Sequence, residues 1–240
     1  MPGASRIDDY VAALGRRLRG PRRLKRDLLA EARDGLADAA EALRADGLDR
    51  DEAERIAVAE FGDVAEIAPG YQAELAACQG RRTAALLFLS VPVTTLMWSA
   101  LWRLHPWRPA DPADIPAWFM PLAQGVDLVQ AATGIAGALA LLALGRAARR
   151  ARRSRLLDPR VLTRGLGVLI LVQMPLVALA STALSNAAAT SIEALEQYPP
   201  AQAVTLISTL LGAWQLASAL RCLHATSRTA ADVAAERVAA

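Results

Sequence analysis

Apolar residues recur at every third or fourth position through the first 80 residues, with polar residues between them. This spacing is typical of helices that bury one face and expose the other. The first run predicts a helix that begins after Ser5, a potential N-cap, and ends before Gly20. Its apolar face consists of Ile7, Tyr10, Val11, Leu14 and Leu18.

A second, longer helix is predicted from Pro21 to about Gly47. Proline is favoured at the first position of a helix, and glycine is favoured just after the last. The same spacing of apolar residues continues between these two residues. The predicted buried face consists of Leu24, Leu28, Ala32, Leu36, Ala39 and Leu43.

A third helix is predicted from residue 49 to residue 62. Asp49 is followed three residues later by Glu52, which is the pattern of a capping box, and Gly62 is a stop signal. The residues expected to be buried on this helix are Ala53, Ile56, Ala57 and Phe61.

Asp63 and Glu66 repeat the start signal of the third helix. We expect only a short turn here, because Pro69 and Gly70 are poor residues for a helix interior. From Tyr71 the chain is expected to continue as a helix into the apolar half of the sequence.

After residue 82 the pattern changes to long apolar stretches. The twenty residues between Arg82 and Arg103 carry no charge, and a helix of this length covers about 30 Å, the thickness of one hydrocarbon core. Similar stretches predict four transmembrane helices, at about 83–104, 122–145, 165–185 and 201–221. The expected fold is all-α, with a small cytoplasmic helical domain at 1–80, a four-helix transmembrane bundle at 81–221 and a cytoplasmic tail at 222–240.

The distribution of charge gives the orientation. Basic residues are enriched in cytoplasmic links of membrane proteins. The link between the second and third stretches contains eight Arg and one acid, whereas residues 186–200 contain no Lys or Arg. We therefore expect a multi-pass protein with both termini in the cytoplasm. The first residues also lack the apolar core of a signal peptide, which agrees with a cytoplasmic N-terminal domain.

Seven basic residues occur without an acid between positions 16 and 26. Beside a bilayer, such a run is expected to contact anionic lipid, and ordinary solvation is the alternative. Residues 1–82 hold 14 bases and 16 acids, a net charge of −2, and the run has no interleaved aromatic residue, so direct nucleic-acid binding is not expected. The candidate lipid-contacting residues are Arg16, Arg17, Arg22, Arg23 and Arg26.

One acid, Asp127, falls inside a predicted span, and Gln124 and Gln130 extend a polar stripe on its helix face. Acids inside a membrane are candidates for function because burying a charge is costly. The stripe is also explained by helix packing or by the nearby outer membrane surface. Ligand or proton sensing and transport are the functional alternatives.

Residues that carry catalysis are scarce. His105 and His224 are predicted on opposite sides of the membrane, so one chain cannot assemble a His/Cys metal site or a Cys/His nucleophile pair. Cys78 and Cys222 are expected on the cytoplasmic side, where thiols stay reduced. The sequence has no Gly-rich phosphate-binding motif. We therefore expect no enzymatic activity, no cofactor and no metal.

The segment from Gly20 to Tyr71 resembles the HAAS signalling or permease-prefix domain of bacteria. The similar parts are the acidic helix that ends at residues 41–47, the restart at 49–53 and the string AEFGDVAEIA at 59–68. The resemblance covers about residues 5–75. It implies a cytoplasmic module ahead of transmembrane helices in the bacterial inner membrane. Genes of this family often lie beside a gene for a PadR-like transcriptional regulator.

The resemblance implies a signalling or regulatory membrane protein whose module binds a protein partner, with a PadR-like regulator as the suspected one. The acid-rich body of the module is expected to attract a basic surface, while a small apolar patch adds adhesion. The alternative is a membrane subunit of an ABC-type transporter, and a third reading is a scaffold. The thin, Ala-rich core also favours self-association. The candidate partner-binding residues are Asp34, Asp38, Glu41, Phe61 and Ile67.

Overall fold

The computed structural model describes residues 5–104, 116–149, 158–187 and 198–227, and these residues form helices joined by short turns. No strand occurs among them, so the expected all-α fold is confirmed. Outside the described residues lie positions 1–4, the link at 105–115, most of the Arg-rich link, the link at 188–197 and the tail beyond residue 227.

The chain divides into two compact units. The first comprises residues 1–79 and 224–240, and the second comprises residues 80–223. The first boundary lies inside one helix, α4 (Val64–Leu104). The end of the last helix belongs to the first unit, where the sequence suggested a separate tail from residue 222.

The first unit contains α1 (Arg6–Arg17), α2 (Arg22–Ala45), α3 (Arg50–Phe61) and the start of α4. The predicted start signals are confirmed: Ser5 and Asp49 accept hydrogen bonds from the backbone N–H groups of Ile7 and Glu52. Gly47 and Gly62 end α2 and α3 with φ angles of 99° and 106°, a backbone conformation that favours glycine.

The core of the first unit is formed by the apolar faces that the periodicity predicted. Leu14, Leu36 and Leu75 are fully buried there, one each from α1, α2 and α4. Much of the remaining core is small, because alanines supply the contact surface of α2 and α3. The buried alanines are Ala32, Ala40, Ala53, Ala57 and Ala68.

The expected interruption at Pro69 and Gly70 was wrong, since α4 runs through both residues. Pro69 is the sixth residue of the helix, so the hydrogen bond that it cannot donate would reach the carbonyl of Ala65. Ala65 is exposed, and its carbonyl can bond to water there. Packing of Ala68 and Leu75 in the core on either side outweighs the local preference against helix.

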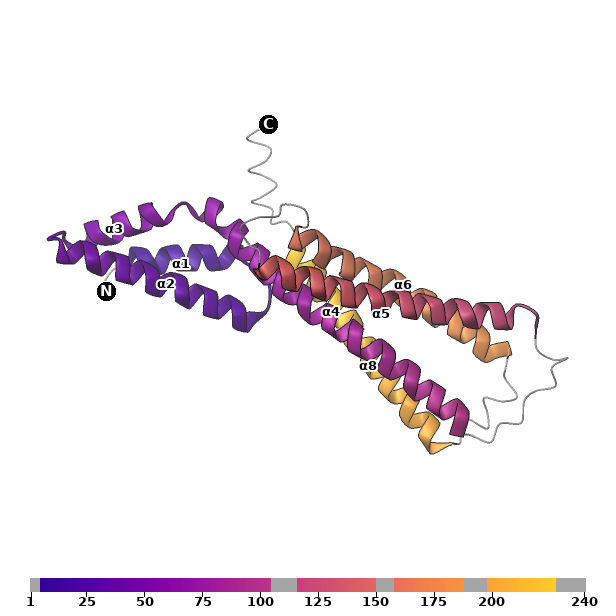
Figure 1. The fold of residues 1–240 in the computed structure, drawn as a ribbon. Coiled ribbons are helices and arrows are strands. Elements are labelled where there is room, and N and C mark those ends of the chain that lie inside the picture. Colours follow the sequence, from indigo (N-terminus) through magenta and orange to yellow (C-terminus); the bar gives the residue numbers. More distant parts are fainter. Residues whose placement is uncertain (1–4, 105–115, 150–157, 188–197, 228–240) are drawn as a thin grey trace. The chain divides into compact units, whose positions relative to one another are not determined.

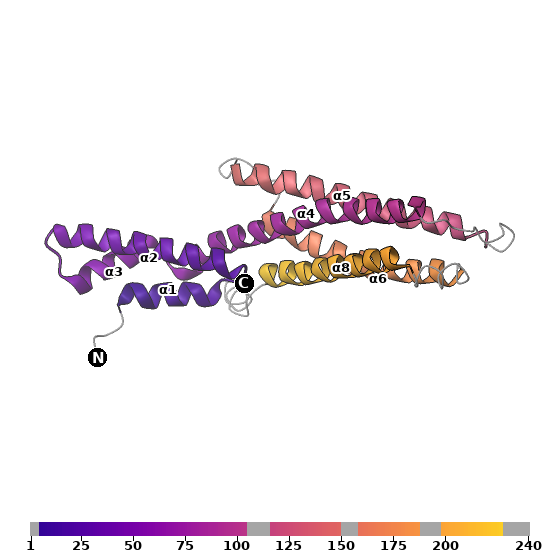
Figure 2. The same ribbon diagram turned by 90° about the horizontal axis from the view of Figure 1, so that it is seen from below.

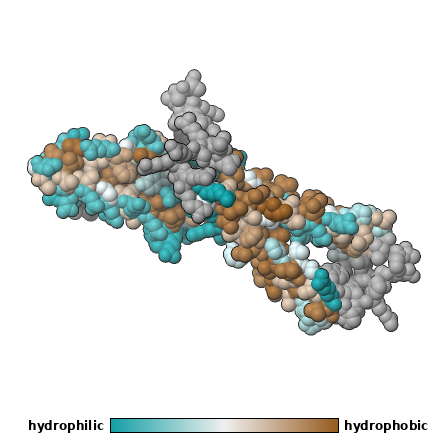
Figure 3. Space-filling view, in the orientation of Figure 1, coloured by the Kyte–Doolittle hydropathy of each residue, from teal (hydrophilic) through white to brown (hydrophobic). Residues whose placement is uncertain are grey.

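The second unit consists of the rest of α4 together with α5 (Phe119–Arg149), α6 (Pro159–Ala187) and α8 (Pro199–Thr226). Four helices are long and apolar enough to cross a membrane, as the sequence predicted. Their outer surfaces carry many exposed apolar side chains, such as Leu96, Leu128 and Leu179, and Figure 3 shows these surfaces in brown.

Small residues bring the four helices into a ring. In Figure 1, α4 lies beside α8 and α5 beside α6, and in Figure 2, α4 lies beside α5 and α6 beside α8. A Cβ at Gly137 of α5 would lie 3.1 Å from the Ala84 carbonyl of α4, and a Cβ at Gly167 of α6 would lie 3.1 Å from the Ala219 carbonyl of α8. Such close backbone approach is typical of helix contacts in membranes.

Candidate interaction sites

The predicted acidic surface lies on α2. Asp34, Asp38 and Glu41 are spaced four and three residues apart, so they share one face of the helix, and all three are exposed. Within the described part of the chain, none of these carboxylates lies within 4.0 Å of a basic group. They therefore form an acidic strip available to a basic partner.

The predicted apolar patch lies at the junction of α3 and α4 and is half-buried. The ring of Phe61 packs edge-on against Tyr10, with the ring centroids 5.8 Å apart. The Tyr10 hydroxyl donates a hydrogen bond of 2.8 Å to the carbonyl of Gly62, and the side chain of Ile67 lies against the same glycine. Phe61 and Ile67 thus lie close together, and part of their surface serves the core of the unit.

The basic run lies where α1 ends and α2 begins. Arg16, Arg22, Arg23 and Arg26 are exposed, whereas Arg17 is half-buried. The Nζ of Lys25 donates to the Leu18 carbonyl at 2.9 Å, which ties the start of α2 to the connecting turn. Lys25 thus has a structural role, whereas the exposed guanidinium groups remain the candidates for lipid contact.

Gln72 joins three segments that are distant in sequence. Its Oε1 accepts the backbone N–H of Arg19 at 2.8 Å, and its Nε2 donates to the carbonyls of Arg19 and Ala225, both at 2.6 Å. The guanidinium of Arg19 also donates to the Ser227 hydroxyl at 2.8 Å. The last turn of α8 is therefore held by Gln72 of α4, and Ser227 just after it by Arg19 in the turn between α1 and α2. Sequence reasoning missed this arrangement.

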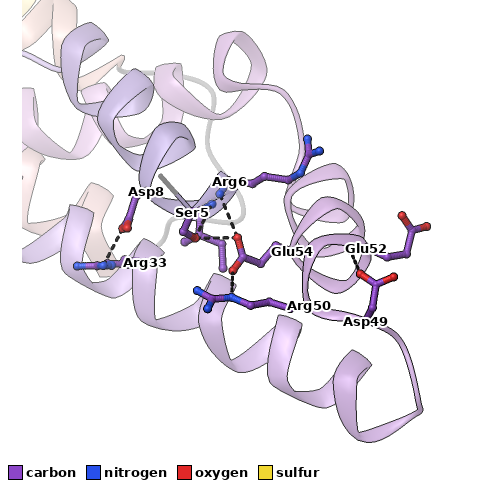
Figure 4. A network of polar contacts seen from close by, with 9 residues as sticks. Ser5, Arg6, Asp8, Arg33, Asp49, Arg50, Glu52 and Glu54 are labelled. Atoms are coloured by element: carbon purple, nitrogen blue, oxygen red, sulfur yellow. Dashed lines mark hydrogen bonds and ion pairs between the residues drawn. The ribbon is translucent and has the colours of Figure 1, made fainter. Parts of the chain in front are cut away.

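Glu54 is a buried carboxylate in α3, only 6% exposed. Its Oε2 accepts the Ser5 hydroxyl at 2.7 Å and the Arg6 backbone N–H at 3.0 Å, and its Oε1 accepts the Nε of Arg50 at 3.0 Å (Figure 4). The carboxylate thus satisfies the free N–H group of Arg6 at the start of α1. The hydrogen bond from Ser5, with smaller contributions from Arg50 and the Arg6 amide, lowers the pKa of Glu54 against the opposing effect of burial.

Replacement of Glu54 by Gln is expected to lower the melting temperature by about 2 to 6 °C at pH 7, because buried groups lose a charge-assisted acceptor. The folded pKa lies below the ordinary 4.5, so this stabilisation is complete above pH 4.5 and is lost as pH falls through the folded pKa. Circular dichroism of the full chain in detergent should therefore show a smaller difference between wild type and Glu54→Gln at pH 3. The exposed Glu60→Gln is the control, and an equal difference at both pH values would contradict the role given to Glu54.

A polar seam connects α4 and α8 inside the second unit. The Thr83 hydroxyl lies 2.6 Å from that of Ser218, and Gln215 donates to the Ser90 hydroxyl at 2.7 Å. Further along, the indole of Trp98 donates to Ser208 at 3.1 Å. Hydrogen bonds between membrane helices contribute about 0.6 kcal/mol each on average. The seam therefore fixes which faces of α4 and α8 meet.

A second polar contact joins α5 and α6, where the Thr133 hydroxyl donates to Gln173 at 2.6 Å. The predicted polar stripe of α5 is not part of it. Gln124 and Asp127 are exposed, and Gln130 is half-buried. Asp127 lies nineteen residues before Arg146, or about 28 Å along a helix.

Among the described residues, no group of three His, Cys, Asp or Glu side chains could hold a metal ion. Cys78 and Cys222 are both free thiols, and the Cys222 sulfur lies 3.0 Å from the Thr83 hydroxyl, within the α4–α8 seam. His224 is exposed at the end of α8, whereas His105 lies outside the described residues. The polar side chains gathered in this structure hold helices together or form exposed surfaces.

Comparison with known proteins gives one match. Residues 9–70 match the sequence profile of the HAAS family, a range that includes α2, α3 and the first turns of α4. The search of curated proteins returned no match, and neither did the search of solved structures.

Proposed function

Since a HAAS domain at residues 9–70 is followed by four membrane-capable helices, we propose that this chain is a membrane-bound signalling protein of the bacterial inner membrane. Its module binds a cytosolic protein, a PadR-like transcriptional regulator, and the bundle reports the state of the envelope to it. Both termini lie in the cytoplasm in this proposal. The chain itself catalyses no reaction and needs no cofactor.

The observation that carries the proposal is the hydrogen bonding of Gln72. A change in the bundle that moves the last turn of α8 would break the bond from Gln72 to Ala225 and release Arg19 from Ser227. The turn between α1 and α2 would then lose its contact with Ser227, and Gln72 of α4 would lose its contact with α8. These bonds support a module that responds to the end of a membrane-capable helix.

The charged residues of the module form two surfaces, one basic and one acidic, that suit different partners. The exposed guanidinium groups at Arg16, Arg22 and Arg23 suit anionic lipid, worth about 1 kcal/mol for each well-placed residue. The acidic strip on α2 suits a basic surface of a protein partner. The bundle and the thin module core also suit assembly of the chain into an oligomer.

Capture of partners from cytosol of the native host tests the proposal. We expect the full chain, purified in a mild detergent, to retain a DNA-binding regulator of the PadR type. The regulator should be identified by mass spectrometry, and the captured amount should fall when the salt concentration is raised. A chain that retains an ATPase and no regulator would instead support the transporter alternative.

A further inference from the structure

The close contacts between the α4–α8 pair and the α5–α6 pair occur at Gly134 and Gly212 and on the side of these residues that lies away from Leu104 and Phe119. A Cβ at Gly134 of α5 would lie 3.5 Å from Val91 of α4, and a Cβ at Gly212 of α8 would lie 2.9 Å from Met174 of α6. Beyond this level the two pairs diverge toward the ends that carry Leu104 and Phe119 (Figure 1).

The faces that meet at this level become polar further along each helix. Residues seven apart share a helix face. A step of seven residues toward the diverging ends leads from Gly134 to Asp127 on α5, from Met174 to Ser181 on α6 and from Gly212 to Thr205 on α8. All three residues reached in this way are exposed. Seven residues from Val91 comes Trp98, which is half-buried. On each helix, the residue at the contact between the pairs is thus followed on the same face, where the pairs separate, by a polar or indole side chain.

A lipid-filled gap would not account for this pattern. Hydroxyl, carboxylate and amide groups are costly to hold in hydrocarbon, and the faces of α6 and α8 turned away from the ring are apolar, with Leu179 and Leu206 exposed. The exposed polar residues Asp127, Ser181 and Thr205 share the helix faces that carry the contacts between the pairs. Figure 3 agrees, since white and pale teal atoms lie between the two diverging arms. Water therefore fits the space between the pairs better than lipid does.

The position of Asp127 along α5 also agrees with access of water to this residue from the outer side of the membrane. Asp127 lies about 28 Å from Arg146 along α5, whereas a hydrocarbon core is about 30 Å thick. If Arg146 marks the cytoplasmic boundary, Asp127 marks the outer one. The carboxylate therefore lies at the mouth of the space between the pairs.

From these observations we infer that the diverging ends of the four helices form a water-filled vestibule, open to the outer side, that binds an organic cation with an apolar body. Asp127 supplies the negative charge, Trp98 supplies an aromatic face for the cation, and Ser181 and Thr205 provide polar walls. The inference rests on the orientation and the sensor role proposed above, and it names the class of ligand that the bundle would sense.

Cysteine labelling tests the vestibule in intact cells. An impermeant maleimide needs water, so Thr205→Cys should be labelled from outside, whereas Leu206→Cys, the next residue on the lipid side, should not. Equal labelling of the two variants, or labelling of neither, would overturn the vestibule.

Binding of tetraphenylphosphonium, a permanently charged lipophilic cation, tests the ligand class. Full-length protein in nanodiscs of zwitterionic lipid should bind it above the level of empty nanodiscs, and Asp127→Asn should weaken binding at least about tenfold, through loss of one charge interaction. Glu60→Gln removes the same charge from the module and should leave binding unchanged. Absence of binding, or equal binding by Asp127→Asn and wild type, would overturn the ligand assignment. Capture of the regulator does not depend on Asp127, so it tests the proposed function separately.

Discussion

Replacement of Gly80 by Ala should destabilise the bundle more than other single-methyl additions on α4. A Cβ at Gly80 would overlap the Thr163 hydroxyl of α6 and would lie 2.9 Å from Leu144 of α5. Both neighbours are fully buried. Neither can turn away without disturbing its own surroundings, so α4 has to move.

Overpacking of this kind costs about 1 to 3 kcal/mol, which corresponds to a decrease of roughly 3 to 10 °C in melting temperature. Gly70→Ala is the matched control on the same helix, because nothing lies within 4 Å of a Cβ at that position. The control should melt at the wild-type temperature or slightly higher, since alanine favours helix over glycine. Thermal unfolding followed by size-exclusion chromatography in detergent measures both variants. Equal melting temperatures would show that α4 does not approach α6 at Gly80.

The helices themselves could be predicted from the sequence because their signals are local. The apolar period in residues 7–43 and the caps at Ser5 and Asp49 each depend on residues within a few positions. The four long helices follow from length and apolarity alone. The error at Pro69 and Gly70 has the opposite origin, because a local preference was outweighed by the packing of Leu75, which no local rule contains.

The roles of Glu54 and Gln72 could not be predicted in the same way. Glu54 receives hydrogen bonds from residues 48 and 49 positions away, and Gln72 reaches residues 53 and 153 positions away. Nothing in the neighbouring sequence distinguishes Gln72 from a solvated side chain. One signal was available for Glu54, since it lies beside Ala53 and three residues before Ala57, on the face that α3 buries.

The polar seam of the bundle did leave a pattern in the sequence. Thr83 and Ser90 are seven residues apart, and the same interval separates Ser208, Gln215 and Cys222. A seven-residue interval keeps side chains on one helix face, so the two series predict matching polar faces on the first and last spans. The residues that pair across the seam, and the close approach at Gly80, depend on the geometry of the whole bundle.

The acidic strip on α2 should govern how fast the regulator associates with the module. Reversal of Asp34, Asp38 and Glu41 to Lys is expected to slow association about tenfold or more at low salt, because steering by exposed charge acts on the encounter rate. Dissociation should change less, since short-range contacts made once the partners have met largely determine it. All three side chains are exposed, so circular dichroism should show an unchanged helical module.

The control reverses Asp9, Asp51 and Glu74, which are also exposed but lie on α1, α3 and α4. It changes the net charge by the same amount without touching the strip. Stopped-flow or surface-plasmon measurements with the captured regulator should show slow association for the α2 variant alone. Raising the salt concentration to 1 M shortens the screening length to about 3 Å, and the two variants should then associate at similar rates. If both variants slow association equally at low salt, the regulator responds to the net charge of the module, and the α2 strip is not its docking surface.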